Sequence, residues 1–323
     1  MKQKRIVVLG GVGFIGSHLC RQLLNEGQEV FCVDIRDVTN APVLRELRRN
    51  PAFHYIHHNI THPFGIRCDE IYNLAAPSMV RYNKALPVET LKLAMQGSIN
   101  TLETARSEHA RVLLASTGSV TNLSYRHNLA PEHYTTTQCI VAEGKRSAEA
   151  LHHAYHTEFG VDARIARIFN TYGSGVDLMD QRVVIKMIVA ALQNREIVIE
   201  GSGEQLRSFC FVEDMVAGLM QLMRVTTTDR MRIVQLGGDQ EISIRALAEQ
   251  IIALTGSRSQ IVHIEARREE VRRRVPDLTA ARNELGWRPQ TSLAEGLKQT
   301  ICYVEKELGQ RNVTAYTWVE MNN

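Results

Sequence analysis

The sequence contains no long apolar run. None of its hydrophobic stretches approaches the roughly 20 residues that a membrane-spanning helix needs. The basic lead-in formed by residues 1–5 is followed by only a short apolar stretch, residues 6–9, before glycines begin, and this is too short for the core of a signal peptide. We therefore expect a cytoplasmic protein that has no membrane partner.

Paired cysteines are also missing. The six cysteines stand at positions 20, 32, 68, 139, 210 and 302, and no two of them have the Cys-x-x-Cys spacing of a zinc or redox site. A reducing compartment suits such a pattern. Histidines cluster at positions 54, 57, 58 and 62, but no acidic partner stands at ligand spacing, so the sequence predicts no metal site.

A strong excess of one charge is absent as well. The 38 basic and 35 acidic residues leave a net charge of only +3, which argues against a nucleic-acid partner. The chain has 323 residues, of which 44% are hydrophobic. These values are typical of a globular protein with room for one large domain and a smaller lobe.

Strand and helix patterns alternate through the first half of the chain. The apolar patterns predict strands at residues 5–9, 29–34, 53–57, 70–74, 111–116 and 163–168. Helical periodicity between these strands predicts helices at residues 14–25, 43–49, 87–106 and 138–157. Such alternation is typical of an α/β fold with a Rossmann-type, doubly wound parallel sheet.

The first strand leads into a glycine pattern, Gly10-x-x-Gly13-x-x-Gly16, which opens the first helix. Glycines let the backbone approach a pyrophosphate, and a helix start offers free N–H groups to it. Asp34 ends the second strand and can accept hydrogen bonds from both hydroxyls of an adenosine ribose. Because its carboxylate would repel a 2′-phosphate, the sequence predicts NAD rather than NADP, although the nearby Arg36 weakens that preference.

After about residue 170 the pattern changes. Glycine-rich turns appear, shorter helices follow, and arginines crowd residues 267–274. We therefore expect an NAD-binding Rossmann domain over residues 1–170. Residues 171–323 should form a smaller α/β lobe that binds substrate and interleaves with the end of the sheet.

A second motif, Glu143-Gly144-Lys145-Arg146, looks like the catalytic helix of the extended short-chain dehydrogenase/reductases that act on nucleotide sugars. The resemblance covers nearly the whole chain. It is nearest to the UDP-glucuronate decarboxylases, which the chain resembles at residues 113–117, 180–184, 201–210 and 276–278.

This resemblance implies site residues. Those implied to border NAD, besides the glycines and Asp34, are Phe14, Ile15, Ile35, Asn59, Ile60, Leu74, Ala75, Ala76 and Lys145. Thr117 would hydrogen-bond the sugar hydroxyl that is oxidised. The residues implied to hold the nucleotide sugar are Ser78, Asn170, Val183, Gln205, Arg207 and Arg274. Guanidinium groups suit this last task, since they bind phosphate oxygens in pairs.

The chain also departs from the family that it resembles. Val141 stands where relatives have a catalytic tyrosine, Gly118-Ser119 replaces a pair that carries a glutamate, Thr121-Asn122 replaces Tyr-Gly, and Ala94 replaces an asparagine near the nicotinamide. Loss of a positioned general base typically costs about 10²–10⁴ in rate. We considered Tyr134, Cys139 and Ser119, the last acting with Lys145, as substitutes, and the sequence does not choose among them.

The sequence favours an NAD-dependent enzyme that oxidises a nucleotide sugar or nucleoside to a keto intermediate, then epimerises or dehydrates it and returns the hydride. The alternatives are a decarboxylase-like activity or a non-catalytic sensor of NAD and nucleotide sugars. The resemblance also implies a homodimer through residues 87–106 and 138–157. The apolar residues considered for the contact are Leu91, Leu102, Leu151 and Ala154, although a face buried within one chain would look the same.

Overall fold

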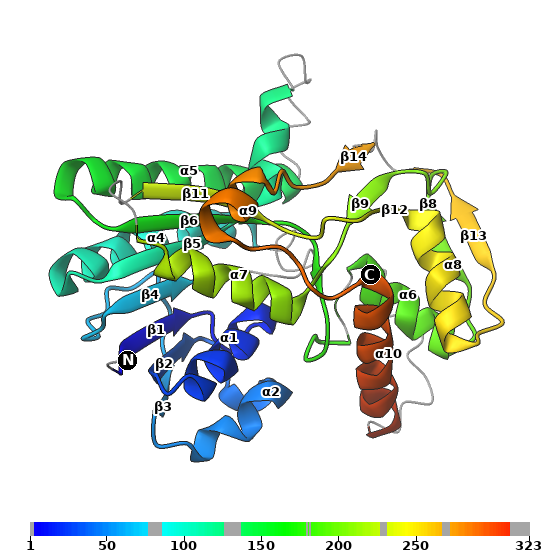
Figure 1. Cartoon of the computed structure of the whole chain (residues 1–323), viewed down its shortest axis with the longest axis horizontal. Coiled ribbons are helices and arrows are strands. Elements are labelled where there is room, and N and C mark those ends of the chain that lie inside the picture. Colours follow the sequence, from blue (N-terminus) through cyan, green and yellow to red (C-terminus); the bar gives the residue numbers. More distant parts are fainter. Residues whose placement is uncertain are drawn as a thin grey trace.

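A computed structural model describes residues 3–76, 86–125, 137–178, 180, 182–226, 231–266 and 272–310. Its largest element is a seven-stranded sheet in the order β11-β6-β5-β4-β1-β2-β3 (Figure 1). All of its strand pairs are parallel. Its strands are β1 (Arg5–Leu9), β2 (Glu29–Asp34), β3 (Phe53–His57), β4 (Glu70–Asn73), β5 (Arg111–Thr117), β6 (Ala163–Ile168) and β11 (Met231–Leu236). The predicted Rossmann-type fold is confirmed.

Helices cover both faces of this sheet, because strands such as β1 are apolar on both faces. On β1, Ile6 and Val8 belong to a core packed against α1 (Phe14–Asn25), α7 (Val212–Arg224) and α9 (Thr279–Leu285). Val7 and Leu9 belong to a second core on the opposite face. There α4 (Pro87–Glu108) and α5 (Thr137–Phe159) pack against each other and against the sheet.

Element bounds follow the sequence pattern closely, with one break. Residues 43–49 do not form one helix but a short α2 (Pro42–Arg45) and a 3₁₀ turn, η2 (Leu47–Arg49). A second 3₁₀ turn, η1 (Val38–Asn40), precedes them. The helix α4 ends at Glu108, two residues beyond the predicted end, because the next residue, His109, takes a left-handed conformation with φ 54°.

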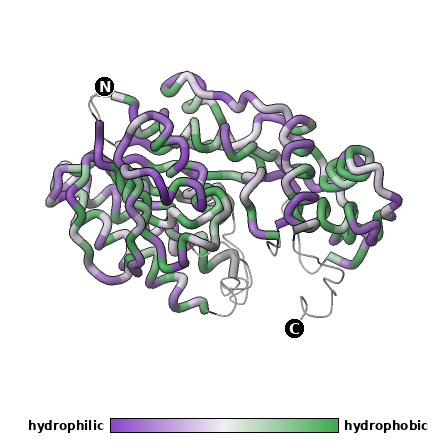
Figure 2. The backbone as a smooth tube through the Cα atoms, turned by 90° about the horizontal axis from the view of Figure 1, so that it is seen from below, coloured by the Kyte–Doolittle hydropathy of each residue, from purple (hydrophilic) through white to green (hydrophobic). Residues whose placement is uncertain are grey.

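A smaller lobe lies beside the larger one (Figures 1 and 2). Its interior is an apolar core formed by side chains of its helices together with Tyr172 and Phe211. Its helices are α6 (Val183–Leu192), α8 (Ile244–Thr255) and α10 (Leu293–Gln310). Its strands form short sheets: β7 (Thr171–Tyr172) with β10 (Cys210–Phe211), β8 (Ile197–Glu200) with β13 (Ile261–Ile264), and β9 (Leu206–Ser208) with β12 (Glu241–Ser243) and β14 (Arg273–Arg274).

The chain passes between the two lobes more than once. After β10 it returns through α7 and β11 to the large sheet, goes back for β12, α8 and β13, and returns again for α9. Residues on both sides of position 170 therefore build the large sheet. Among the described helices, none is long and apolar enough to cross a membrane.

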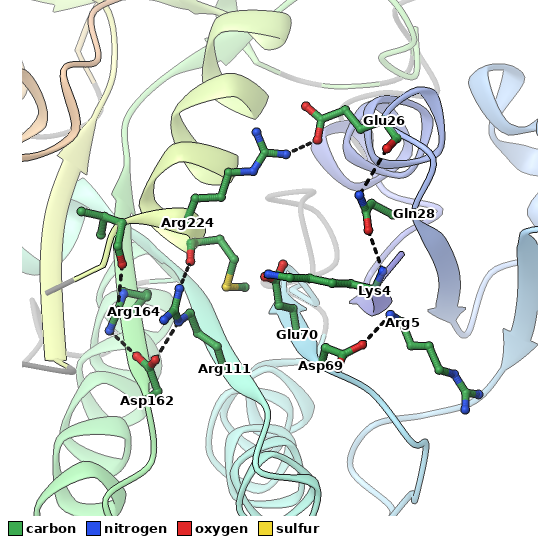
Figure 3. A network of polar contacts seen from close by, with 12 residues as sticks. Lys4, Arg5, Glu26, Gln28, Asp69, Glu70, Arg111, Asp162, Arg164 and Arg224 are labelled. Carbon is green, nitrogen blue, oxygen red and sulfur yellow. Dashed lines mark hydrogen bonds and ion pairs between the residues drawn. The ribbon is translucent and has the colours of Figure 1, made fainter. Parts of the chain in front are cut away.

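Ion pairs hold together the edge of the sheet where the strands begin (Figure 3). Arg111 and Arg164, near the starts of β5 and β6, both contact Asp162, at 2.7 and 2.5 Å. Lys4 pairs with Glu70 across β1 and β4. This edge is thus occupied by structural contacts, and the opposite edge, where the strands end, is left to carry a site.

Candidate active site

The glycine loop lies at the carboxyl edge of the sheet, between β1 and α1. Gly10 has φ +77°, and a methyl group built on it would lie 2.8 Å from the backbone of Ala75. A methyl group on Gly16 would lie 2.3 Å from the Gly10 carbonyl oxygen. No side chain caps the start of α1 at Gly13. The loop is therefore tight, and the N–H groups of the first turn of α1 remain available to an anion.

Asp34 lies beside this loop at the end of β2. Its side chain is buried, and each oxygen accepts one backbone hydrogen bond, from Val12 N–H at 3.0 Å and from Arg36 N–H at 2.9 Å. A carboxylate oxygen has a second lone pair, so both can still accept a ribose hydroxyl. The next residue, Ile35, is apolar and 54% exposed. This arrangement fits an adenosine whose ribose meets Asp34 and whose base covers Ile35.

Arg36 approaches the same place. Its Nε lies 3.8 Å from Asp34 Oδ1, and its guanidinium lies 3.7 Å from where a side chain on Gly13 would begin. The side chain is nearly half exposed. The positive charge therefore stands beside the loop without closing it.

The residues after β3 and β4 supply the opposite wall. Leu74 and Ala75 are partly buried, Ala76 is exposed, and Ala75 adjoins Gly10. Asn59 is exposed, and its Oδ1 accepts a hydrogen bond from Thr61 N–H at 3.1 Å. Ile60 is only 4% exposed because its side chain packs on Gly97 of α4, so a ligand would meet its backbone rather than its side chain.

Thr117 ends β5 on the same edge. Its Oγ1 accepts a hydrogen bond from Ser119 N–H at 3.2 Å, which leaves the hydroxyl hydrogen free to be donated outward. Ser119 lies in the 3₁₀ turn η3 (Gly118–Tyr125). A side chain at position 118 would collide with the ring of Phe169, 2.5 Å away, so glycine is the residue that this packing admits.

The helix α5 is fixed to β5 and β6 through Glu149. Ser116 Oγ donates to Glu149 Oε1 at 2.5 Å, and Arg167 donates to both carboxylate oxygens, at 3.1 and 2.7 Å. Arg146 also donates to the Val120 carbonyl of η3, at 2.8 Å. These contacts set the height of α5 against the ends of the strands.

Lys145 stands one turn before Glu149 and is buried, with 7% of its surface exposed. Among the described residues its ammonium has no hydrogen bond or ion pair within the usual distances. Burial lowers the pKa of Lys145 to about 8, and the nearby carboxylate of Glu149 opposes part of that effect. A group of this kind can exchange a proton near neutral pH.

Val141 precedes Lys145 by one helical turn, is partly buried, and offers no polar atom. Two predicted site residues, Ser78 and Tyr134, lie outside the described residues. Cys139 lies within α5, but the structure does not describe its side chain. Of the proposed substitutes for tyrosine, the structure therefore places only Ser119.

A pocket of about 100 Å³ has Asn170 and Val183 in its lining. Asn170 Nδ2 donates to the Ser208 carbonyl at 3.3 Å. Arg182 also lines this pocket, and Asp180 holds its guanidinium through two hydrogen bonds of 2.8 and 2.6 Å. The same guanidinium lies 5.2 Å from the ring of Phe14, so the pocket adjoins the start of α1.

Arg207 and Arg274 lie on the neighbouring strands β9 and β14, where they are register partners. Gln205 precedes β9, and its Nε2 donates to the Glu200 carbonyl at 3.4 Å. The predicted substrate residues on the described chain thus fall into two groups, one at the pocket and one on this small sheet.

Comparison with known proteins gives this geometry a family. The family model of the GDP-mannose 4,6-dehydratases matches residues 7–300 of the chain. The chain belongs to that family. It is 38% identical over 311 residues to UDP-glucuronic acid decarboxylase 1 of Xenopus tropicalis. This match covers 95% of the present chain and 73% of that decarboxylase. It is 39% identical over 300 residues to UDP-glucuronic acid decarboxylase 5 of Arabidopsis thaliana, covering 91% and 87%.

Among solved structures, the UDP-glucose 4-epimerase of Thermotoga maritima, crystallised with UDP-glucose, is similar with a TM-score of 0.79 and 26% identity. The match covers 94% of this chain and 99% of the epimerase. The predicted membership of the extended dehydrogenase/reductases is thereby confirmed. This GDP-mannose 4,6-dehydratase family member is therefore related to decarboxylases, dehydratases and epimerases alike.

Sequence reasoning missed Glu149, Arg167 and Arg182 in this family member. Glu149 follows Lys145 at a spacing of four, which on a predicted helix places both on one face and was the available signal. Arg167 gave no such signal, since only the packed structure brings it to Glu149. Arg182 lies in the stretch 180–184 that resembles the decarboxylases, but only the packed structure brings it to Phe14.

The prediction that Leu102 could serve in a dimer contact is wrong. Leu102 is fully buried in the core between α4 and the sheet, so it cannot touch a second subunit. An apolar residue on a helix faces either its own core or a partner, and the sequence pattern does not distinguish the two.

Proposed function

We propose that the protein is an NAD-dependent enzyme that modifies a nucleotide sugar by transient oxidation to a keto sugar, epimerisation or dehydration, and re-reduction. The observation that carries this proposal is the position of Lys145 and Thr117 at the same sheet edge as the glycine loop and Asp34. When bound, NAD supplies a reversible hydride acceptor. Every other contribution would come from side chains of the protein.

Asp34 and the first turn of α1 would hold the adenosine ribose and the pyrophosphate. Thr117 would donate a hydrogen bond to the sugar oxygen, and Lys145 would bind the nicotinamide ribose. Asn170 and Val183 would meet the nucleotide in the pocket, while Arg207, Arg274 and Gln205 would grip its phosphates. The binding of NAD and of UDP-sugars by solved relatives supports these assignments; a UDP-glucuronic acid 4-epimerase of Bacillus cereus was crystallised with both.

Of the reactions considered, epimerisation is the one that the pair Gly118-Ser119 favours. Neither residue offers a carboxylate, and Phe169 fills the space that a side chain at position 118 would need. The acid–base group that the resemblance places there in decarboxylases and in 4,6-dehydratases is therefore missing, although the similar proteins of Xenopus tropicalis and Arabidopsis thaliana are decarboxylases.

The experiment is direct. The purified protein is incubated with NAD and, in turn, with UDP-glucose, UDP-galactose and UDP-glucuronic acid, while nicotinamide absorbance is followed and products are analysed by mass spectrometry and NMR. Loss of water marks dehydration, loss of carbon dioxide marks decarboxylation, and an unchanged mass with a changed NMR spectrum marks epimerisation. Failure of every nucleotide sugar to reduce the cofactor or to change would refute the proposal.

We further propose that the protein is a homodimer that pairs through α4 and α5. Val88 and Met95 lie on one face of α4 at a spacing of seven residues and are 60% and 44% exposed, which is unusual for apolar side chains without a partner. Sedimentation equilibrium should give a dimer, and Met95→Glu should give a monomer. Ile264→Glu, at an exposed apolar residue of the smaller lobe, is the control and should leave the dimer intact.

A further inference from the structure

The sheet-facing side of α5 contains few groups that can carry a proton. Val141, Lys145 and Glu149 follow one another at intervals of four residues, and His152 comes next. Val141 is aliphatic. Glu149 is occupied by Ser116 and by both donors of Arg167. His152 is fully buried, and its Nδ1 contacts the Ala148 carbonyl at 2.8 Å. Lys145 makes no hydrogen bond or ion pair to another described residue, and His152, whose Nε2 also lacks a partner, lies two helical turns further along α5, away from the end where the glycine loop lies.

We propose that Lys145 is the general base of this enzyme and that its neutral amine takes the proton from the sugar hydroxyl that is oxidised. The proposal rests on the proposed function and replaces the absent phenol at position 141. The hydroxyl O–H bond breaks and a new N–H bond forms at Nζ, while the O–H electron pair forms the second C–O bond as the carbinol C–H bond breaks and its hydride leaves to the acceptor that NAD would supply when bound. When the hydroxyl is restored, the ammonium returns the same proton, so protons balance over a full turnover.

The contacts of Glu149 place Lys145 at the right height. The bond from Ser116 to Glu149 fixes one turn of α5 against the residue that precedes Thr117. Lys145 lies one turn, or about 6 Å, nearer the start of the helix. Two residues of strand span about 6.6 Å, so this turn is level with Thr117 and Gly118 at the edge of the sheet. Lys145 thus starts from the same level of the sheet as the hydroxyl of Thr117, which would donate to the sugar oxygen.

The surroundings of Lys145 favour the neutral amine. At its level α4 presents Ala94 and Leu91, which are 3.0 and 3.4 Å from the side-chain position of Gly144. From β5 come the uncharged Ser116 and Thr117, and from β6 comes Arg167, which pairs with Glu149.

Among the described residues, the titratable groups near Lys145 are therefore the carboxylate of Glu149, which is paired with a guanidinium, and the buried His152 on its own helix, which is neutral because its pKa is lowered to about 4. An ammonium enclosed in this way is poorly solvated, and this is why the pKa of Lys145 falls to about 8.

The substitution that removes the phenol also removes the group that would keep the lysine charged. A phenolate one turn away would stabilise the ammonium, whereas the isopropyl group of Val141 stabilises no charge. With a pKa near 8, about a quarter of the lysines carry a neutral amine at a pH half a unit lower. An exposed lysine of ordinary pKa would have almost none.

The first measurement needs no turnover. The NAD-loaded protein is labelled with [ε-¹³C]lysine, and the Cε shifts are followed against pH by NMR, with the Lys145 signal assigned from its absence in Lys145→Arg. We expect Lys145 to titrate near pH 8 and the exposed Lys92 to titrate near the value of a free lysine. A Lys145 signal that titrates with Lys92 overturns the proposal.

The second measurement is the rate of cofactor reduction by the nucleotide sugar that the proposed function identifies. The rate should rise with pH through about 8 and fall by about 10²–10⁴ in Lys145→Ala. Small primary amines should restore Lys145→Ala, with rates that follow amine basicity, because a base can be supplied from solution. Lys145→Arg keeps the positive charge but has no neutral form near pH 8, so it should stay inactive and unrescued.

Two other variants keep the result decisive. Tyr134→Phe and Cys139→Ser should retain most activity, and loss of turnover in either, or an active Lys145→Arg, contradicts the lysine base. If no nucleotide sugar reduces the cofactor, the proposed function fails and the lysine proposal falls with it. Turnover by a protein whose Lys145 titrates as an ordinary lysine overturns the lysine proposal alone.

Discussion

Arg207 and Arg274 occupy paired positions on the adjacent parallel strands β9 and β14, so their side chains leave the small sheet on the same face. Two guanidinium groups on one face suit a diphosphate, whose oxygens they bind in pairs. Arg207→Ala should weaken binding of a nucleoside diphosphate by about 1.5–3 kcal/mol, or roughly tenfold to a hundredfold, in isothermal titration.

Arg207→Lys should recover only part of this loss, because an ammonium cannot form the planar fork. The control is Arg258→Ala, which removes an exposed arginine from the connection between α8 and β13 and should leave the affinity unchanged. Equal affinities in Arg207→Ala and Arg258→Ala would show that the β9–β14 pair does not bind the diphosphate.

How far the sequence predicted the structure depended on how local each signal was. The strands from β1 to β6 came out almost residue for residue, because strands such as β1, β2 and β5 are largely apolar on both faces and turn residues separate the elements. Asp34 was found because strand, glycine pattern and acid occur in one short unit. By contrast, Arg167 reaches Glu149 only after β6 pairs with β5, and no local pattern encodes that contact. The burial of Leu102 was missed for the same reason.

The glycine loop gives a prediction about cofactor binding. A methyl group at Gly16 would meet the Gly10 carbonyl, which is backbone and cannot rotate away, so Gly16→Ala must displace the loop. Such overpacking costs about 1–3 kcal/mol, and we expect NAD affinity to fall by roughly tenfold to a hundredfold. Gly65→Ala is the matched control, because nothing lies within 4 Å of its side-chain position. Calorimetry with NAD would contradict the assignment of the loop if the two variants bound equally well.

Glu149 links the stability of the site to the proton affinity of its lysine. Glu149→Gln removes the charge that raises the pKa of Lys145, so the ε-carbon titration of Lys145 should move below its position near pH 8. It also leaves Arg167 without its anion. Because Arg167 is about a quarter exposed, we expect a loss of about 2–4 kcal/mol in urea unfolding, less than for a fully buried pair. Glu143→Gln, at an exposed position on the same helix, should change neither quantity.

His152 should make the protein sensitive to acid. Its burial, with Nε2 lacking a hydrogen-bond partner, lowers the pKa of His152 to about 4 from the ordinary 6.5. Between these values the unfolded chain binds a proton that the folded chain does not, so stability falls as the pH falls from 6.5 towards 4. The shift corresponds to about 3 kcal/mol.

His152→Leu should abolish this acid-dependent loss, which urea titrations at a series of pH values would measure against the parent. The adjacent His153 is exposed and provides His153→Leu as the control. Parallel pH profiles of stability in the parent and in His152→Leu would mean that the histidine is already hydrated or charged in the folded protein.

Lys145 should lower the free energy of unfolding at neutral pH. Its effect should change with pH on the alkaline side, whereas that of His152 changes on the acid side. Its pKa is about 8 in the folded protein and 10.5 in the unfolded chain, so folding at neutral pH buries a charge that water would solvate better. Lys145→Met removes this cost, and the unfolding free energy should rise by about 2–3 kcal/mol near pH 7. Between pH 8 and 10.5 the unfolded parent holds a proton that the folded parent has released, so the parent gains stability with rising pH. The advantage of Lys145→Met should therefore shrink across that interval and vanish above it.

Urea unfolding of both proteins at matched pH tests this, with Lys92→Met as the exposed control. A difference that does not change between pH 8 and 10.5 would mean that Lys145 is charged in the folded state, and a charged lysine could not accept the proton of a sugar hydroxyl.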